Sequence, residues 1–221
     1  MTIKRLLLIS LLCISLAGAQ SFNTDRFAIG LKVGSLGGGG DLTMRIINPL
    51  NVRVGSSFFS FAPDLGEAGT TEEYTMDATI NLQAIYTLLD YYPFKKSGFH
   101  LSTGLYISAN TMKSDIYPQK TYTIGGDEYT PEKLGDVSMD LNMDGTCPYI
   151  GFGFGNRLNG RSGFGMTLDM GGYYQGAPEA KMSATGLVEP TASADQEKMI
   201  EESLAGLTWY PVVSFGINYK F

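Results

Sequence analysis

His100 and Ser102 are the residues whose types and spacing come nearest to nucleophilic catalysis. A serine hydroxyl attacks a carbonyl when a histidine takes its proton and a carboxylate orients that histidine. Residues two apart share one face of a β-strand, so the pair could meet if its segment is extended. The alternation around them predicts that both point into a polar interior, where a hydrogen-bonded histidine is the simpler interpretation. We therefore assign no catalytic residue.

The stretch "DLNMDG" at 140–145 has the ligand spacing that opens an EF-hand calcium loop. Such a loop requires a bidentate carboxylate at its twelfth position, and that position is Gly151 here. In a strand, Asp140, Asn142 and Asp144 would instead share one face. We predict no specific metal site, only weak, multi-site binding of divalent cations by the acidic loops.

Residues 125–128 (GGDE), followed by Tyr129, resemble the GGDEF signature of diguanylate cyclases. That site needs an α/β domain around it, and the rest of the sequence does not have the pattern of one. Glycine and aspartate between β-forming residues equally favour a tight hairpin turn. Thr130 and Pro131 then suit the N-cap and first position of a short helical turn. We predict a loop hairpin with no catalytic, cofactor-binding or metal-binding role.

The N-terminal segment predicts export from the cytoplasm. Basic residues at 4 and 5 precede an apolar run over 6–16, and the small residues Ala17 and Ala19 follow. This order is typical of a secretory signal peptide, and the run is shorter than the ~20 residues of a membrane-spanning helix. We predict a signal peptide over 1–19 and one domain over 20–221.

The charge and the cysteines limit the class of protein further. The formal net charge is −6, and it becomes −8 without the two basic residues of the leader. An acidic chain is a poor partner for nucleic acid, so none is expected. Cys147 is the only cysteine outside the leader, which excludes an internal disulfide framework. No cofactor is expected.

Alternation of apolar and polar residues with a period of two recurs along the chain and predicts β-strands. The C-terminal stretch "WYPVVSFGINYKF" is the clearest case, because its odd-numbered residues are apolar and its even-numbered residues are mixed. Eight such segments cover 26–36, 40–46, 51–61, 74–89, 98–110, 148–156, 163–174 and 209–221. The expected fold is therefore all-β.

The two faces of these strands differ in a way that favours a transmembrane barrel. One face is apolar with aromatic residues near the strand ends, and the other carries charged residues, asparagine and glycine, as expected for lipid-facing and lumen-facing positions. We predict that Leu82 and Leu168 face lipid. A secreted sandwich or lipocalin-like protein is the alternative, since alternation alone does not say which face is wet. The residues expected in the lumen are Lys32, Arg45, Arg53, Lys220, Asp41, Asp77, Asp169, Thr79, Thr167, Asn81, Gln83 and Asn218.

The connections alternate in length, as they do in outer-membrane barrels. Short turns are expected at 48–51, 91–98 and 157–163, and a glycine turn at 37–40. Long acidic loops are expected at 63–73, 111–139 and 175–207. Because Asp140 and Ile150 belong to opposite expected faces but have the same parity, we predict a bulge near 145–146. The last loop should hold a helix at 193–206, capped by Ser193 and ended by Gly206.

The leader, the eight amphipathic strands and the terminal "SFGINYKF" resemble the small outer-membrane β-barrel proteins of Gram-negative bacteria, the OmpA/OmpX/OmpW-like group. The resemblance implies an eight-stranded, antiparallel, up-and-down transmembrane β-barrel in the cell outer membrane. It also implies contact with outer-membrane lipids and lipopolysaccharide, and recognition of the terminal Phe221 by the barrel-assembly machinery. The expected state is a monomer.

The expected function is structural or a surface interaction, without enzymatic activity. Eight strands enclose a lumen just wide enough to be filled by side chains, which argues against a general diffusion porin. Two alternatives remain. One is a narrow channel or a conduit for small apolar molecules, and the other is a lipid-modifying enzyme, because some outer-membrane lipid hydrolases use a similarly spaced histidine and serine.

Overall fold

The chain, described by a computed structural model, is placed over residues 24–63, 74–124, 127–155, 158 and 162–221. The expected signal peptide at 1–19 lies outside these residues, as do most of loop 63–73 and the Gly125-Gly126 turn. A single 3₁₀ turn, η1 (Thr24–Arg26), precedes the first strand. Among the described residues, no helix is long and apolar enough to cross a membrane.

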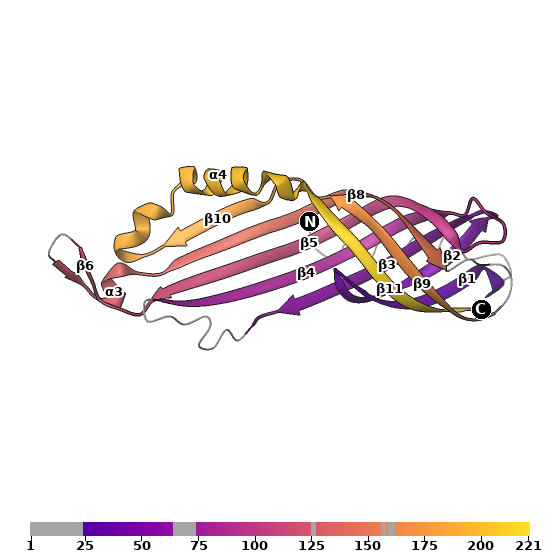
Figure 1. The fold of residues 1–221 in the computed structure, drawn as a ribbon, viewed down its shortest axis with the longest axis horizontal. Helices are drawn as coiled ribbons and strands as arrows, with labels where there is room; N and C mark the ends of the chain where they lie inside the picture. Colours follow the sequence, from indigo (N-terminus) through magenta and orange to yellow (C-terminus); the bar gives the residue numbers. More distant parts are fainter. Residues whose placement is uncertain (1–23, 64–73, 125–126, 156–157, 159–161) are drawn as a thin grey trace, which may run out of the picture.

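Eight strands form a closed antiparallel ring, which confirms the expected all-β, up-and-down barrel (Figure 1). Each strand pairs with the next along the ring, and the last pairs with the first, with Ile29 opposite Tyr219. The strands in ring order are β1 (Phe27–Gly34), β2 (Gly37–Ile47), β3 (Leu50–Phe61), β4 (Tyr74–Tyr91), β5 (Phe99–Pro118), β8 (Val137–Gly155), β9 (Gly163–Tyr174) and β11 (Trp209–Lys220).

Three consecutive strands are much longer than the others. β4, β5 and β8 have 18, 20 and 19 residues, whereas the other ring strands have 8 to 12. About 9–11 residues of tilted strand suffice to cross a bilayer. The additional residues of β4, β5 and β8 continue beyond the ring, where a further strand, β10 (Glu179–Ala184), pairs with β8. We call residues 74–79, 113–118, 137–142 and 179–184 the extended sheet.

Short elements lie at the far end of the extended sheet and along its β10 edge (Figure 1). The hairpin expected from "TIGGDEYT" is confirmed on its described residues, because β6 (Tyr122–Ile124) pairs with β7 (Asp127–Tyr129). The expected helical turn is α3 (Pro131–Leu134), with proline in its first turn, although Thr130 makes no side-chain cap. η2 (Gly186–Thr191), α4 (Ala194–Ser203) and η3 (Ala205–Thr208) follow β10.

Several sequence boundaries were wrong. The glycine turn was placed at 37–40, but those residues begin β2, and the turn lies at Ser35-Leu36. Gly37, with a φ of 84°, supplies the left-handed backbone that follows the turn. The expected loop at 111–139 is mostly strand, because β5 and β8 stay paired up to Ile116 opposite Val137. The expected helix starts at its Ser193 cap, but its C-cap is Leu204 and not Gly206.

The expected bulge near 145–146 is also absent. β5 and β8 keep one unbroken register from Phe99 opposite Phe154 to Ile116 opposite Val137. Asp140 and Ile150 therefore lie on the same outward face of one straight strand. The outward residues change from polar at Asp140 to apolar at Ile150 because the surroundings of the outward face change. The backbone alternation itself continues without interruption.

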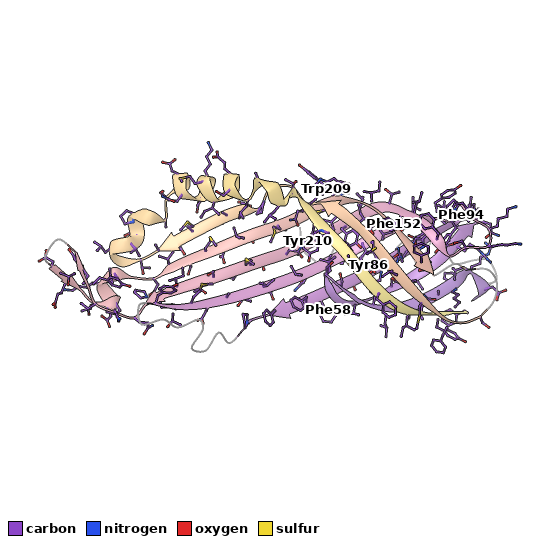
Figure 2. The ribbon with its side chains drawn as sticks, in the orientation of Figure 1. Phe58, Tyr86, Phe94, Phe152, Trp209 and Tyr210 are labelled. Atoms are coloured by element: carbon purple, nitrogen blue, oxygen red, sulfur yellow. The ribbon has the colours of Figure 1, made fainter. Side chains whose placement is uncertain are left out.

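The outer wall of the ring is apolar over its whole height. Phe164, Leu31 and Met166 have 82 %, 74 % and 66 % of their surfaces exposed. Aromatic side chains gather at two levels, with Phe58 and Trp209 near the extended sheet and Phe94 at the opposite end (Figure 2). An apolar band between two aromatic girdles is the outer surface of a transmembrane barrel.

The inside and outside of β4 were assigned wrongly. Leu82 was expected to face lipid, and Tyr86 and Leu88 share its face of β4. Each of these two residues has only 2 % of its surface exposed, and both belong to the interior core. Leu82 packs against the same core. Since alternate residues face opposite ways, the outward face rather than the lumen holds Asp77, Thr79, Asn81 and Gln83. The assignment failed because the interior beside β4 is itself apolar and aromatic.

Candidate functional site

A buried ionic cluster crosses the inside of the ring. The Arg53 guanidinium donates to Asp169 from Nη1 (2.5 Å) and Nη2 (3.2 Å), and to Asp90 Oδ1 from Nη2 (3.0 Å). Lys32 Nζ lies 2.8 Å from Asp41 and 3.9 Å from Asp169. Buried charges of one sign without partners would cost several kcal/mol each, so this pairing makes the filled interior possible.

The structure brings together most of the expected lumen residues. Arg45 also points inward and donates to the Leu158 carbonyl (2.8 Å), and Asn218 is buried. Asp90 was missed, because the β4 faces were assigned in the wrong phase. Asp90 lies an even number of residues from Tyr86 and Leu88 and therefore shares their face of β4. A carboxylate at the end of this apolar face is the signal that could have located it.

His100 and Ser102 lie in this cluster but do not form a catalytic pair. His100 Nε2 lies 3.0 Å from Asp169 Oδ1 and its Nδ1 lies 3.2 Å from the Gly98 carbonyl. Ser102 donates its hydroxyl proton to Asp90 (2.6 Å). Both ring nitrogens of the histidine are therefore engaged with groups other than the serine. Since both side chains are buried inside the ring, a lipid substrate has no access to them from the bilayer.

Tyrosine rings fill the interior between the ionic cluster and the extended sheet. Tyr106 contacts the rings of Tyr86, Tyr149 and Tyr173 at centroid distances of 5.0–5.1 Å. Tyr173 then stacks on Tyr210 at 5.2 Å. Aromatic pairs at such distances attract each other beyond the burial of their surface. The rings come from different strands around the barrel and together close the lumen across its width.

Polar groups anchor these rings. Asn110 Nδ2 donates to the Tyr173 hydroxyl (2.9 Å), and the Tyr210 hydroxyl donates to the Ser35 carbonyl (2.8 Å). Lys32 Nζ lies 4.8 Å from the centre of the Tyr86 ring, within the range of a cation–π contact. Buried tyrosine hydroxyls need such partners, so the rings are fixed in place and are not loose filler.

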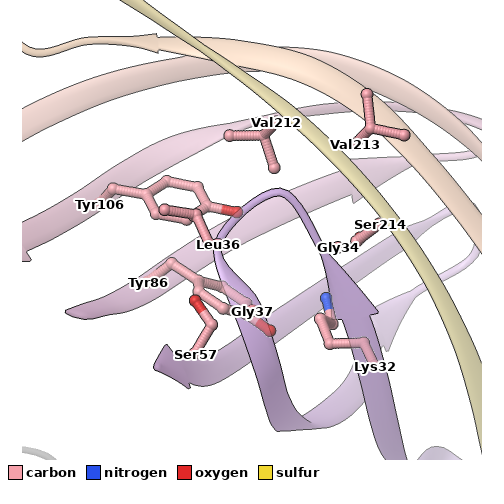
Figure 3. A pocket seen from close by; sticks show the side chains of 10 residues that line it. All are labelled: Lys32, Gly34, Leu36, Gly37, Ser57, Tyr86, Tyr106, Val212, Val213 and Ser214. Atoms are coloured by element: carbon pink, nitrogen blue, oxygen red, sulfur yellow. The ribbon is translucent and has the colours of Figure 1, made fainter. Parts of the chain in front are cut away.

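The interior retains a small cavity beside these rings, lined by Lys32, Ser57, Tyr86, Tyr106 and Val212 among others (Figure 3). Its volume is about 20 Å³. A cavity of this size holds about one water molecule. The cavity is therefore too small for a substrate.

The extended sheet reverses the chemistry of the ring. Its inner face, continuous with the lumen, carries Met139, Leu141 and Met182, and its outer face carries Lys113 and Asp140. Lys113 pairs with Asp140 at 3.0 Å on that exposed face. Asp140 and its neighbours at 142 and 144 therefore belong to a straight strand and not to a metal loop. Among the described residues, no group of three or more His, Cys, Asp or Glu side chains could hold a metal ion.

A groove separates the inner face of the extended sheet from α4. It is lined by Met139 and Leu141 on β8 and by Met199, Ile200 and Leu204 at or near the C-terminal half of the helix. Its volume is about 400 Å³. Gln196 and Ser203 add polar side chains to this otherwise apolar lining.

Solved structures share this architecture. The crystal structures of Acinetobacter baumannii CarO2 and CarO superpose with TM-scores of 0.58 and 0.57 at 20 % and 18 % identity. Each match covers 88 % of this chain, and 98 % and 97 % of those chains. A major outer membrane protein from Thermus thermophilus is similar at a TM-score of 0.47 and 17 % identity over 88 % of this chain and 99 % of that one.

The chain has the fold of an outer-membrane β-barrel protein. No protein-family profile and no curated protein sequence matches it. At these identities the likeness establishes the architecture of the barrel and leaves its role to the residues described above.

Proposed function

We propose that this barrel is an integral outer-membrane protein with a surface-interaction role carried by its extended sheet. In this arrangement the short turns face the periplasm, and β4, β5, β8 and β10 project from the cell surface. The apolar band of the ring and its two aromatic girdles support insertion. The predicted leader supports export, and the surplus strand length supports the projection.

The closed interior is the observation that carries this proposal. The Arg53 cluster and the stacked tyrosines come from strands all around the ring, and the cavity beside them has room for about one water molecule. A pore needs a continuous path, whereas an interaction protein needs only a rigid barrel that holds a presented surface. We therefore locate the function outside the lumen.

Planar-bilayer recording of the refolded protein tests this. We expect no steady conductance from the wild type. Heat-modifiable migration of the protein recovered with the lipid verifies that the barrel has inserted. Open, long-lived conductance of the wild type would overturn the proposal and favour a channel.

A conduit for small apolar molecules is the second candidate, because the groove beneath α4 is apolar and has the volume of a small-ligand site. It requires passage past the tyrosines. Uptake of a neutral apolar dye into vesicles that contain the wild-type barrel would favour it. The same rate with and without the protein would count against it.

Further expectations are part of the proposal. The exposed terminal Phe221, whose amide donates to the Phe27 carbonyl (3.1 Å), should be read by the barrel-assembly machinery. Deleting it should impair assembly without blocking export. Lipids and lipopolysaccharide should surround a monomeric barrel, and activity as a lipid-modifying enzyme is not expected.

A further inference from the structure

β10 is an edge strand whose outer hydrogen-bonding positions are occupied by side chains. It pairs with β8 on one side. On the other side, the amide of Ala180 donates to Glu201 Oε1 (3.0 Å), and the amide of Met182 donates to Glu197 Oε1 (2.8 Å). Both acceptors belong to α4. An uncovered edge of this kind is a template for pairing with another chain.

The spacing of the two glutamates fits the edge. Alternate amides along a strand repeat every ~6.8 Å, and residues four apart on a helix rise by about 6 Å. A helix lying along β10 can therefore place one carboxylate on each of two successive outward amides. The carboxylates of Glu197 and Glu201 accept the hydrogen bonds that the carbonyl groups of a neighbouring strand would otherwise accept. Their charge strengthens these bonds.

Polar bonds hold α4 in place more than packing does. None of its residues is buried, and Met199 keeps 60 % of its surface exposed. The groove of about 400 Å³ separates its apolar side chains from Met139 and Leu141. The helix can therefore leave β10 without breaking up a hydrophobic core.

We infer that α4 is a detachable cap that prevents β10 from pairing with β10 of a second copy of this chain. Once the cap is released, antiparallel pairing with Ala180 opposite its counterpart places Glu179 opposite Lys181 at both ends. These are non-hydrogen-bonded pairs, in which side chains lie closest, and opposite charges there are favourable. Centring the pairing on Lys181 would instead put two like charges together.

The direction of β10 determines how the two copies are oriented. The strand runs away from the ring (Figure 1), so antiparallel edges join barrels that point in opposite directions. Barrels in two facing membranes, or in detergent, satisfy this geometry, whereas two barrels in one membrane do not. The cap thus controls whether barrels in two facing membranes pair with each other.

The full-length refolded barrel in mild detergent allows a direct test. The double variant Glu197→Ala/Glu201→Ala removes both acceptors and leaves the ring unchanged, which heat-modifiable migration on gels verifies. We expect its dimer dissociation constant, measured by light scattering, to fall at least about tenfold below that of the wild type, a change of ~1.4 kcal/mol. Asp195→Ala/Glu202→Ala removes the same charge from the same helix and should remain monomeric.

A third variant tests whether the edge itself makes the contact. Met182→Pro in the double-Ala background removes the outward amide, and edge strands tolerate proline where the amide faces outward. It should restore the monomer. Hydrogen exchange reports on the cap when it is measured at dilutions at which the double variant is monomeric, because the amides of Ala180 and Met182 should then exchange faster than in the wild type.

Three results would overturn the inference. The first is unchanged protection of both amides in the dilute, monomeric double variant, which would mean that the glutamates do not hold the helix. The second is fast exchange in a barrel that stays monomeric, which would mean that a freed edge does not attract a second copy. The third is a dimer that persists with Met182→Pro.

Discussion

The ring and the extended sheet share the same strands but have opposite chemistry on each face. Along the outer face of β5, Leu105 and Ile107 in the ring give way to Lys113 and Asp115 in the extended sheet. The register to β8 is unbroken throughout. The same strand thus passes from hydrocarbon to water. Its outer face is apolar in the first medium and charged in the second.

The inner faces reverse in the opposite sense. Inside the ring, β5 contributes His100 and Ser102 to a charged cluster, whereas the same face carries Met112 at the border of the extended sheet and Ile116 within it. The ring can hold charges inside because partners from other strands surround them. The inner face of the extended sheet instead lies across a groove from the apolar side chains of α4. Apolar residues therefore lie on the outer face of the sheet within the ring and on its inner face within the extended sheet.

The largest expected effect comes from breaking the ring's interior. Arg53→Ala leaves Asp90 and Asp169 buried without their cation, which should cost about 3–5 kcal/mol. Lys113→Ala breaks the exposed pair with Asp140 in the extended sheet and should cost no more than about 1 kcal/mol. Denaturant unfolding in lipid vesicles measures both free energies. Equal costs would remove the distinction between the two regions.

A charge placed on the outer face should distinguish the regions next. Leu168→Arg in the ring should cost about 2–4 kcal/mol if it lies near the bilayer midplane. Asp77→Arg, which is also outward but lies in the extended sheet, should be close to neutral. The same unfolding assay compares them. A large penalty at position 77 would place that part of β4 in lipid.

The inner face of the extended sheet should show a moderate apolar contribution. Leu141→Ala removes a side chain with 7 % of its surface exposed and should cost about 2 kcal/mol, the low end for such truncations, because the groove lies beside it. Asn142→Ala, its neighbour on the outer face, is the control and should cost less than about 0.5 kcal/mol. Hydrogen exchange of β8 and β10 amides gives the local values.

The smallest expected effect concerns the exposed carboxylates of the outer face. Asp115 is the main cause of the raised pKa of the Tyr117 phenol, with a lesser contribution from Asp77. Asp115→Asn should therefore lower the pKa of Tyr117 more than Asp77→Asn does, as measured by ring-carbon NMR. Because exposed charges are screened over about 8 Å at physiological ionic strength, added salt should reduce both shifts. Salt-independent shifts would contradict exposure to water.

The sequence alone determined the strands of the ring, because period-two alternation depends only on neighbouring residues. It also determined most inward positions, including Arg53, His100 and Asp169, and the Ser193 cap of α4. These features follow from local chemistry. The apolar outer wall and its aromatic girdles can be predicted from the residues of each strand alone, without knowledge of contacts between distant residues.

Only the tertiary structure decided which face of β4 is inside and where β5 and β8 end. The inner face of β4 is apolar because it packs against Tyr106 of β5, whose ring stacks on Tyr86. The salt bridges of Arg53 to Asp90 and Asp169 exist because ring closure brings three strands together. Glu197 and Glu201 read as ordinary solvated residues until the fold lays their helix along the free edge of β10. Long-range pairing decides such contacts, and a local pattern does not encode it.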